Sequence, residues 1–381
     1  MSFVLGRGPD KDTTAKPAGE FGSFRALDGS NGAPLYIDFD GPHAVLVVGK
    51  RGYGKSYTLG VLAESLAQVV GVAPVVLDPM GVFGTLAGSG ETRATVPGKR
   101  VPATVIERPT ISPGVLDPRS WCALLGLSPE SGTGALVWQA AQESSTLAEM
   151  QEHIVSIDAP RTDIRAASNH LSLADAWDVF DPAGLTARDL AAHGVTVLDL
   201  SGLDAAPMNA VARGVAEALY RGRVDERIDR LPWLLVDEAH TFFDGVAAPA
   251  LETILTRGRA PGVSLVLATQ RPNALSPVAV SQSDIVVSHR LTSRADIEAL
   301  ERARPTYMDE SLAAQLPTAP EEVVVVDDAT ETVHTVTVRR RHTPHGGGSP
   351  SASLVRTNGV GDSGDSDNSG DSGDELRTMP P

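Results

Sequence analysis

The stretch VLVVGKRGYGKSYTLG at residues 45–60 constrains the fold of this chain more than any other part of its sequence. An apolar run leads into residues 49–56, which fit the pattern G-x-x-x-x-G-K-[ST] at every fixed position. Glycines let the backbone N–H groups of such a loop wrap a phosphate without Cβ clashes, and the following helix points its positive end at the same place. The pattern predicts a buried strand, a phosphate-binding loop and a helix. A glycine-rich turn without a ligand is the alternative.

Two side chains of this loop have a defined chemical role in such a pattern. The Lys55 ammonium would reach the β- and γ-phosphates of a nucleotide, and the Ser56 hydroxyl would bind Mg²⁺. We therefore expect ATP and Mg²⁺ as cofactors. The residues that we expect around the nucleotide are Gly49, Lys50, Arg51, Gly52, Tyr53, Gly54, Lys55, Ser56 and Tyr57.

A nucleotide site also needs a carboxylate to hold the metal ion, and the segment LLVDEAH supplies one at the end of a second apolar run. We expect Asp237 to bind Mg²⁺, directly or through water, and Glu238 to orient and deprotonate the attacking water. The alternative is an acidic pair at the end of a strand that only caps the next helix.

The next apolar run ends in ATQRP and is preceded by TRGRAPG. Gln270 is a candidate to sense the γ-phosphate or to position the water, although it could also be a solvent-facing strand end. Arg257 and Arg259 lie at the end of an expected helix, where they could simply complement the helix dipole. The functional interpretation is an arginine finger that reaches the phosphate of a neighbouring subunit, with Arg259 favoured over Arg257.

Four further polar residues have simpler interpretations. Asp78, in VVLDPMGVF, is most simply a turn-forming Asp-Pro residue, and Asp199 is a strand-end cap. His240 and His289 have no partner at a metal-binding spacing, so we interpret both as structural.

Short apolar runs without alternation recur along the chain, as expected for strands that are buried on both faces. Helical stretches separate several of them, notably 56–70 and 208–222, which predicts an α/β fold: a mostly parallel, doubly wound sheet with helices on both faces. The predicted core strands are 44–49, 74–78, 195–200, 233–238, 263–270 and 284–291.

Shifts in composition divide the chain into three parts. We expect a loose segment at 1–33, an ATPase domain at 34–348 and a disordered acidic tail at 349–381, rich in Ser, Gly and Asp. Within the domain we predict an edge strand at 34–40, a helical insertion at about 109–190, and a late hairpin of 321–328 with 332–341.

The net charge of the chain restricts the kinds of molecule that it can bind. The formal net charge is −16, and only five of the 32 basic residues are Lys. This composition is typical of a halophilic, archaeal protein, although a GC-rich genome also favours Arg over Lys. Net negative charge argues against a nonspecific nucleic-acid coat but allows a local basic channel. The single cysteine, Cys122, excludes an internal disulfide, and no apolar run suits a signal peptide or a membrane span, so we expect a cytoplasmic protein.

Five motifs occur in a specific order: GKRGYGKS, LDPMGVF, LLVDEAH, GRAPGVSLVLATQRP and RRRHTPHGG. From residue 35 to about 347 the chain resembles the HerA/FtsK superfamily of P-loop ATPases, and HerA-like archaeal ATPases in particular. The resemblance implies a RecA/ASCE-like fold and hexameric rings that use ATP to pump double-stranded DNA, with sites between subunits. It also implies the roles given above for Lys55, Ser56, Asp237, Glu238, Gln270 and Arg259.

The resemblance is incomplete in two places and adds one further expectation. HerA proteins usually begin with a small β-barrel that helps to dock a nuclease, whereas only about 40 residues precede the loop here. A nuclease or other protein partner therefore stays an open alternative. The family often has an acidic residue where this chain has Val82. Arg341 and His345, in RRRHTPHGG, match a terminal brace and are candidate contacts to a neighbour's nucleotide.

Two classes of function remain after this comparison, and a third is disfavoured. The leading hypothesis is an ATP-driven translocase of double-stranded DNA in repair, DNA transfer or packaging. The alternative is a nucleotide-dependent switch or assembly ATPase that acts on a protein partner through the helical insertion. A small-molecule kinase is disfavoured, because a monomeric kinase has no use for an arginine finger in trans.

Overall fold

The structure is a computed structural model, and it describes residues 3–8, 16–26, 28–88, 101–303, 305–308 and 311–347. The predicted acidic tail, 349–381, lies outside the described residues.

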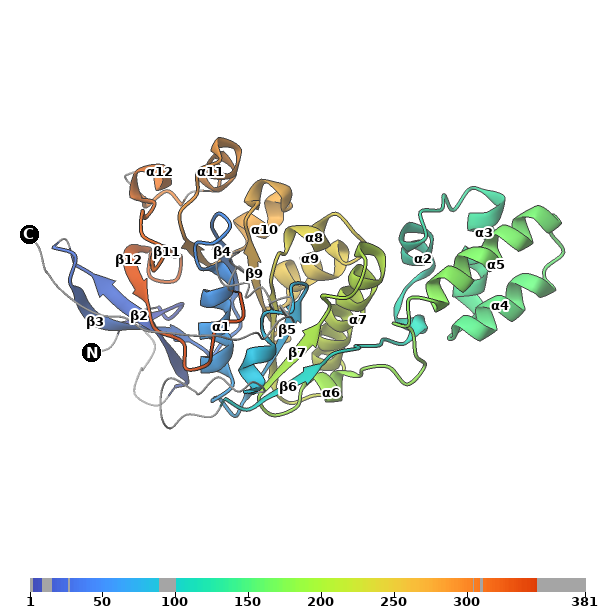
Figure 1. The fold of residues 1–381 in the computed structure, drawn as a ribbon, viewed down its shortest axis with the longest axis horizontal. Helices are drawn as coiled ribbons and strands as arrows, with labels where there is room; N and C mark the ends of the chain where they lie inside the picture. Colours follow the sequence, from blue (N-terminus) through green and yellow to red (C-terminus); the bar gives the residue numbers. More distant parts are fainter. Residues whose placement is uncertain are drawn as a thin grey trace, which may run out of the picture. The chain divides into compact units, whose positions relative to one another are not determined.

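Twelve described strands form one sheet in the order β1-β3-β2-β12-β11-β10-β4-β9-β8-β5-β7-β6 (Figure 1). From β10 to β6 every neighbouring pair is parallel. On the other side of β10 four successive pairs are antiparallel: β10 with β11, β11 with β12, β12 with β2, and β2 with β3. The strands are β1 (Phe3–Leu5), β2 (Ala18–Arg25), β3 (Asn31–Asp38), β4 (Ala44–Val48), β5 (Val72–Asp78), β6 (Ala103–Ile106), β7 (Val195–Asp199), β8 (Leu231–Val236), β9 (Ser264–Thr269), β10 (Ile285–Ser288), β11 (Glu322–Asp327) and β12 (Thr332–Val338).

The six predicted core strands are confirmed as β4, β5, β7, β8, β9 and β10. Their side chains alternate between two apolar cores on opposite faces of the sheet. In β4, for example, Val45 and Val47 join one core, and Leu46 and Val48 join the other. Because both faces are covered, every position of β4 is apolar, which explains why the sequence shows no alternation there.

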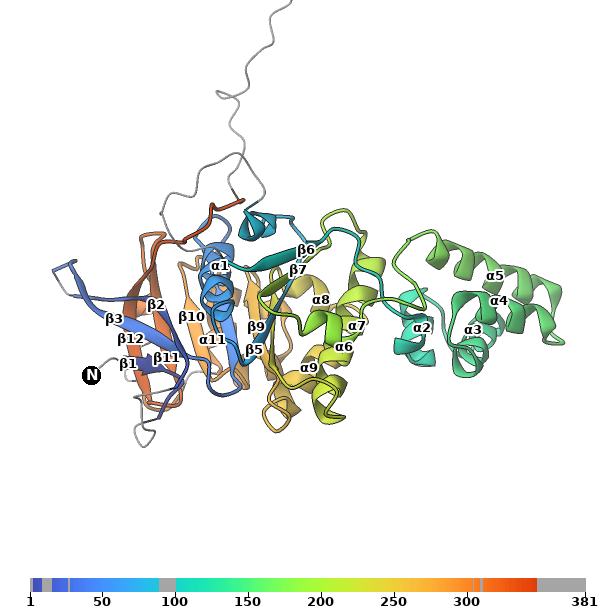
Figure 2. The same cartoon turned by 90° about the horizontal axis from the view of Figure 1, so that it is seen from below.

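Helices cover both faces of this sheet, as predicted (Figure 2). Leu59, Leu62 and Leu66 of α1 pack in one core, whereas α7 and α9 pack in the other. No helix in the described ranges has the length and apolar character needed to cross a membrane. The helices are α1 (Lys55–Leu66), α2 (Pro118–Leu124), α3 (Gly132–Glu143), α4 (Leu147–Ser156), α5 (Arg161–Asp175), α6 (Ala187–Leu190), α7 (Ala205–Val224), α8 (His240–Phe243), α9 (Ala248–Arg257), α10 (Pro277–Ser281), α11 (Arg294–Glu301) and α12 (Leu312–Gln315), with the short 3₁₀ helices η1 (Gly84–Ala87), η2 (Pro113–Val115) and η3 (Pro272–Ala274).

The segment predicted as a helical insertion contains α2 to α6. Its two ends meet at an isolated parallel bridge between Ile111 and Phe180. Asp117 caps α2 by accepting a hydrogen bond from the backbone of Ser120, and its carboxylate also pairs with Arg213 of α7 at 2.6 Å. The start of the insertion is therefore tied to the helix layer that covers the sheet.

The prediction of a loose segment at 1–33 is wrong for its described residues, because β1 and β2 belong to the sheet. Leu5 and Phe21 are fully buried in the core. A Cβ at Gly22 would collide with the backbone oxygen of Thr337 in β12, so this glycine allows close strand packing and does not mark flexibility. The strand predicted at 34–40 is present as β3, but it lies between β1 and β2 and not at the edge.

Candidate nucleotide-binding site

The loop between β4 and α1 has the backbone geometry that the motif predicts. Gly54, immediately before α1, has φ 101° and ψ 7°, a left-handed conformation that side chains disfavour. A Cβ on Gly49 would lie 2.5 Å from the Cβ of His289 in the segment after β10. Glycine is therefore required at one position by the turn into the helix and at the other by a side chain packed beneath the loop.

Lys55 begins α1 with its side chain directed inward. It is only 5% exposed, and within the described part of the chain its ammonium donates a single long hydrogen bond, 3.5 Å to the Lys50 oxygen. Burial lowers the pKa of Lys55, while the carboxylates of Glu238 and Asp237 act in the opposite direction. A buried cation with so few partners is suited to bind an anion such as a phosphate.

Ser56 and Asp237 meet although 181 positions separate them in the sequence: the Ser56 hydroxyl donates to the Asp237 carboxylate at 2.7 Å. Asp237 is 1% exposed. Burial, followed by the neighbouring charge of Glu238, raises the pKa of Asp237 to about 6, and the hydrogen bond from Ser56 opposes this rise. A hydroxyl beside a carboxylate is a donor set that fits Mg²⁺, which prefers oxygen ligands and keeps several of its own waters.

Glu238 has an unusual backbone for a residue with a side chain, since its φ is 45°. Its peptide oxygen accepts hydrogen bonds from the backbone N–H and the hydroxyl of Thr241, both at 2.9 Å, and these bonds hold the conformation. Burial raises the pKa of the Glu238 carboxyl, opposed by the charges of Lys55 and Arg51. Backbone strain of this kind is concentrated at functional sites.

The strand order brings Gln270, the remaining predicted site residue, to the same edge of the sheet. β9 lies between β4 and β8, with Thr269 aligned to Val48 and Leu267 aligned to Val236. Gln270, the residue after β9, therefore lies between the phosphate-binding loop and the carboxylates of Asp237 and Glu238. Neither the separation of these residues along the chain nor a local sequence pattern predicts that Gln270 lies beside the loop and the two carboxylates.

Arg259 is not part of this arrangement within one chain. It lies in the turn between α9 and β9, and its side chain is exposed, as is that of Arg257. β9 runs parallel to β4, so a residue before β9 and a loop after β4 lie at opposite edges of the sheet. Five residues of strand separate these edges by roughly 16 Å.

Two histidines interpreted as structural both touch the candidate site. His289 is 1% exposed, and its Nε2 forms a hydrogen bond of 3.0 Å with the Thr58 hydroxyl of α1. Burial and then the charge of Lys55 lower the pKa of His289 to about 4, so it is a neutral support for the loop. His240 Nδ1 lies 3.4 Å from Glu238 Oε2. Metal-ligand spacing could reveal neither role, because one contact joins the segment after β10 to α1 and the other is a carboxylate–imidazole contact between residues two apart.

Asp78 behaves as the predicted turn residue, and Asp199 behaves as the predicted strand-end cap. The Asp78 carboxylate accepts hydrogen bonds from the backbone of Val82 at 3.1 Å and Phe83 at 2.7 Å, and Asp199 accepts one from Ser201 at 3.0 Å. Burial raises the pKa of Asp78 to about 6. The described residues contain no group of three or more His, Cys, Asp or Glu side chains arranged to hold a metal ion.

The C-terminal motif RRRHTPHGG packs along α1 of its own chain. The Glu64 carboxylate, 1% exposed, pairs with Arg339 at 2.9 Å and Arg341 at 3.3 Å. The backbone N–H of Arg341 donates to the Tyr57 hydroxyl at 2.8 Å, and the ring of His345 lies 5.6 Å from that of Tyr57. The Arg341 guanidinium is thus engaged inside its own subunit, unlike the contact to a neighbour that the resemblance implied.

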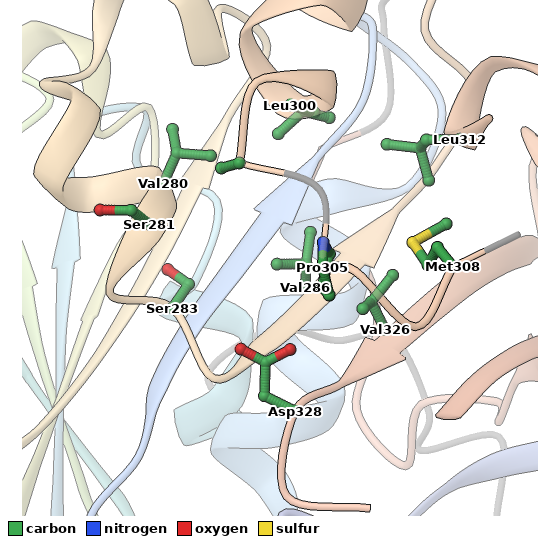
Figure 3. A pocket seen from close by; sticks show the side chains of 11 residues that line it. Val280, Ser281, Ser283, Val286, Leu300, Pro305, Met308, Leu312, Val326 and Asp328 are labelled. Atoms are coloured by element: carbon green, nitrogen blue, oxygen red, sulfur yellow. The ribbon is translucent and has the colours of Figure 1, made fainter. Parts of the chain in front are cut away.

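A separate pocket lies beside β10 and β11 (Figure 3). Its lining is mainly apolar, with the Asp328 carboxylate as its charged group, and includes none of the predicted site residues. Its apolar side chains include Val280, Val286, Leu300, Met308 and Leu312.

Comparisons with known proteins identify the family and the fold of this chain. The family model described as "Helicase HerA, central domain" matches residues 20–217, just over half of the chain. VirB4 of Thermoanaerobacter pseudethanolicus is similar in structure, with a TM-score of 0.64 and 15% identity over 84% of this chain and 96% of that chain. The plasmid coupling protein TrwB in complex with ADP and Mg²⁺ has a TM-score of 0.56 and 15% identity over 88% and 98%. No curated protein matched. The structural likeness shows a P-loop NTPase fold, and the family match shows that the chain belongs to the HerA helicase central-domain family.

Proposed function

We propose that this protein is an ATP-hydrolysing ring motor, a homo-hexamer that translocates double-stranded DNA in repair, DNA transfer or packaging. The observation that carries the proposal is the meeting of the phosphate-binding loop, the Ser56–Asp237 pair and Glu238 at one edge of the parallel sheet. Membership of a helicase family supports the coupling to DNA.

Each residue of the candidate site has a different role in the proposed hydrolysis. Lys55 neutralises phosphate charge, and Ser56 and Asp237 hold Mg²⁺, which supplies further charge neutralisation when it is bound. Glu238 orients the attacking water and accepts its proton, and Gln270 senses the γ-phosphate. The buried, low-dielectric position of Lys55 and Asp237 strengthens each of these interactions.

Arg259 completes the site from a neighbouring subunit. It is exposed and lies at the sheet edge opposite the loop, so it cannot serve its own nucleotide without a large rearrangement. In a closed ring, a head-to-tail interface brings two different faces of adjacent subunits together. This geometry supports a finger that acts in trans.

The substitution Arg259→Ala tests this assignment. We expect turnover to fall by roughly 10³-fold, because an arginine finger stabilises the charge of the transition state, while nucleotide binding is retained. The measurements are the steady-state ATPase rate and a fluorescent-nucleotide titration. Arg257→Ala is the matched control at the same helix end, and it should leave turnover unchanged.

Mixed rings sharpen the test. Arg259→Ala subunits should regain turnover beside Glu238→Gln subunits, since the site of an Arg259→Ala subunit keeps its own Glu238 and obtains Arg259 from the Glu238→Gln neighbour. Normal turnover in pure Arg259→Ala protein would refute the role of Arg259 as the arginine finger. Loss of turnover in Arg257→Ala alone would assign that role to Arg257.

The DNA partner is supported by the family and opposed by the charge distribution. Segments 242–248 and 271–283, the candidate pore loops, contain Arg271 as their only basic residue, and the chain carries a net charge of −16. Phosphate contacts by Lys and Arg dominate most DNA binding and weaken in salt. This scarcity favours the second candidate function, an ATPase that acts on a protein partner through the helical insertion.

The ATPase rate in concentrated KCl, with and without double-stranded DNA, distinguishes the two. We expect a hexamer in the presence of ATP and a severalfold stimulation of turnover by DNA. The oligomer mass is measured by light scattering under the same conditions. DNA-insensitive hydrolysis would replace the translocase with the protein-directed ATPase.

A further inference from the structure

His240, the first residue of α8, lies between the proposed catalytic base and the end of β9. Its Nδ1 is 3.4 Å from Glu238 Oε2 and 3.3 Å from the Thr269 hydroxyl. Glu238 Oε2 is buried and accepts no hydrogen bond within the described part of the chain. Nδ1 thus lies close to a carboxylate oxygen that has no hydrogen-bond partner among the described residues.

The Thr269 hydroxyl is itself fixed. Thr269 is fully buried, and its oxygen accepts a hydrogen bond from the backbone N–H of Arg271 at 3.0 Å. The imidazole is therefore held against Thr269, the residue before Gln270, and Thr269 is in turn hydrogen-bonded to Arg271, the residue after Gln270. The contact of the imidazole with Thr269 joins the start of α8, which follows β8, to the end of the neighbouring strand β9.

The protonation state of His240 allows its ring to donate a hydrogen bond to Glu238 but not to form an ion pair with it. Burial, followed by the charges of Arg271 and Lys55, lowers the pKa of His240, so the ring is neutral at pH 7 and carries one N–H. An N–H on Nδ1 can be shared between the Glu238 carboxylate and the Thr269 hydroxyl, which agrees with two contacts that are both slightly long. A neutral partner orients a carboxylate without the depression of its basicity that a cation would cause.

We propose that His240 is a positioning residue for Glu238: its Nδ1–H holds Oε2, so that the other carboxylate oxygen is directed at the attacking water, and Thr269 couples this orientation to Gln270. The proposal rests on the proposed hydrolytic function. Its logic is that of a base oriented by a third group, which is how other enzymes fix the lone pair that takes the proton.

Three substitutions test the positioning in the full-length protein. His240→Leu should lower kcat by about tenfold to a hundredfold with little change in KM, because the base is present but poorly oriented. His240→Asn, whose amide nitrogen lies where Nδ1 was, should recover most of this loss. Exposed His193, changed to Leu, is the matched control and should leave kcat unchanged.

A double variant separates positioning from a merely structural role. If His240 acts only through the Glu238 carboxylate, His240→Leu should have no further effect on turnover in a Glu238→Gln background. An additional loss of tenfold or more in that background would overturn the proposal, as would unchanged kcat in His240→Leu. Should His240→Leu fail to fold, Thr269→Val against Thr269→Ser gives the same comparison, with loss expected only for Val.

A measurement that does not require hydrolysis keeps this proposal distinct from the proposed function. Nitrogen-15 NMR of histidine-labelled, nucleotide-free protein reports the tautomer of each ring, and His240→Asn identifies the signal. We expect the Nδ1–H tautomer in the wild type and a shift toward Nε2–H in Glu238→Ala. An Nε2–H ring in the wild type would overturn the positioning role even if the protein is an active ATPase, whereas an Nδ1–H ring in a protein without ATPase activity would refute only the hydrolytic function.

Discussion

Replacement of Lys55 by alanine is expected to abolish ATP hydrolysis, with a fall in kcat/KM of roughly 10³-fold or more. The reason is that the ammonium is buried and makes one long hydrogen bond within the described residues, so most of its favourable interaction is available to a phosphate. Steady-state ATPase assays and nucleotide titration measure the effect.

The control for this change is another lysine that lies far from the loop. Lys16 forms a half-exposed ion pair with Asp40 at 3.2 Å, and its replacement by alanine should leave turnover unchanged. Thermal unfolding of both variants checks the fold, because loss of Lys55 removes a cation that acts on the buried carboxyls of Asp237 and Glu238. A folded Lys55→Ala protein that still binds and hydrolyses ATP would refute the site.

The substitution Glu238→Gln should separate binding from chemistry. We expect ATP to bind with nearly unchanged affinity and turnover to fall by about 10²-fold or more, because the amide keeps the shape of the side chain but cannot accept the proton of the water. Single-turnover hydrolysis, combined with a nucleotide titration, provides both quantities.

Glu152, exposed on α4 in the helical insertion, is the matched Glu→Gln control. Its variant should be indistinguishable from the wild type. If Glu238→Gln turned over ATP at the normal rate, the general-base role would be lost, and with it the reason to regard the strained backbone at φ 45° as functional.

Much of the fold could be predicted, because the core strands of this sheet are buried on both faces. At β4 and β9 every residue except Ala44 is buried, so continuous apolar runs marked the strands directly. The strand β6 escaped prediction, since its four residues are mostly half-exposed and carry a weaker signal. The strand β2 escaped because its glycines indicated a loose chain, whereas Gly22 serves the close approach of β12.

The sequence predicted the individual residues of the candidate site, but not the contacts between them. Lys55, Ser56, Asp237 and Glu238 were identified because phosphate and metal chemistry require those residue types at those points of a strand–loop pattern. The contacts of His240 with Thr269 and of His289 with Thr58 were not, because each joins segments that are distant in the sequence and adjacent only in the fold.

By itself, the sequence determined the phosphate-binding loop, the acidic pair and the α/β class, since each depends on local chemistry or on burial that repeats along a segment. Only the tertiary structure decided that Ser56 meets Asp237, that Arg341 pairs with Glu64 of its own chain, and that Arg259 lies at the opposite sheet edge from the loop. The physical reason is that strand order is set by the packing of the whole sheet. That order decides which residues, distant in sequence, share one edge.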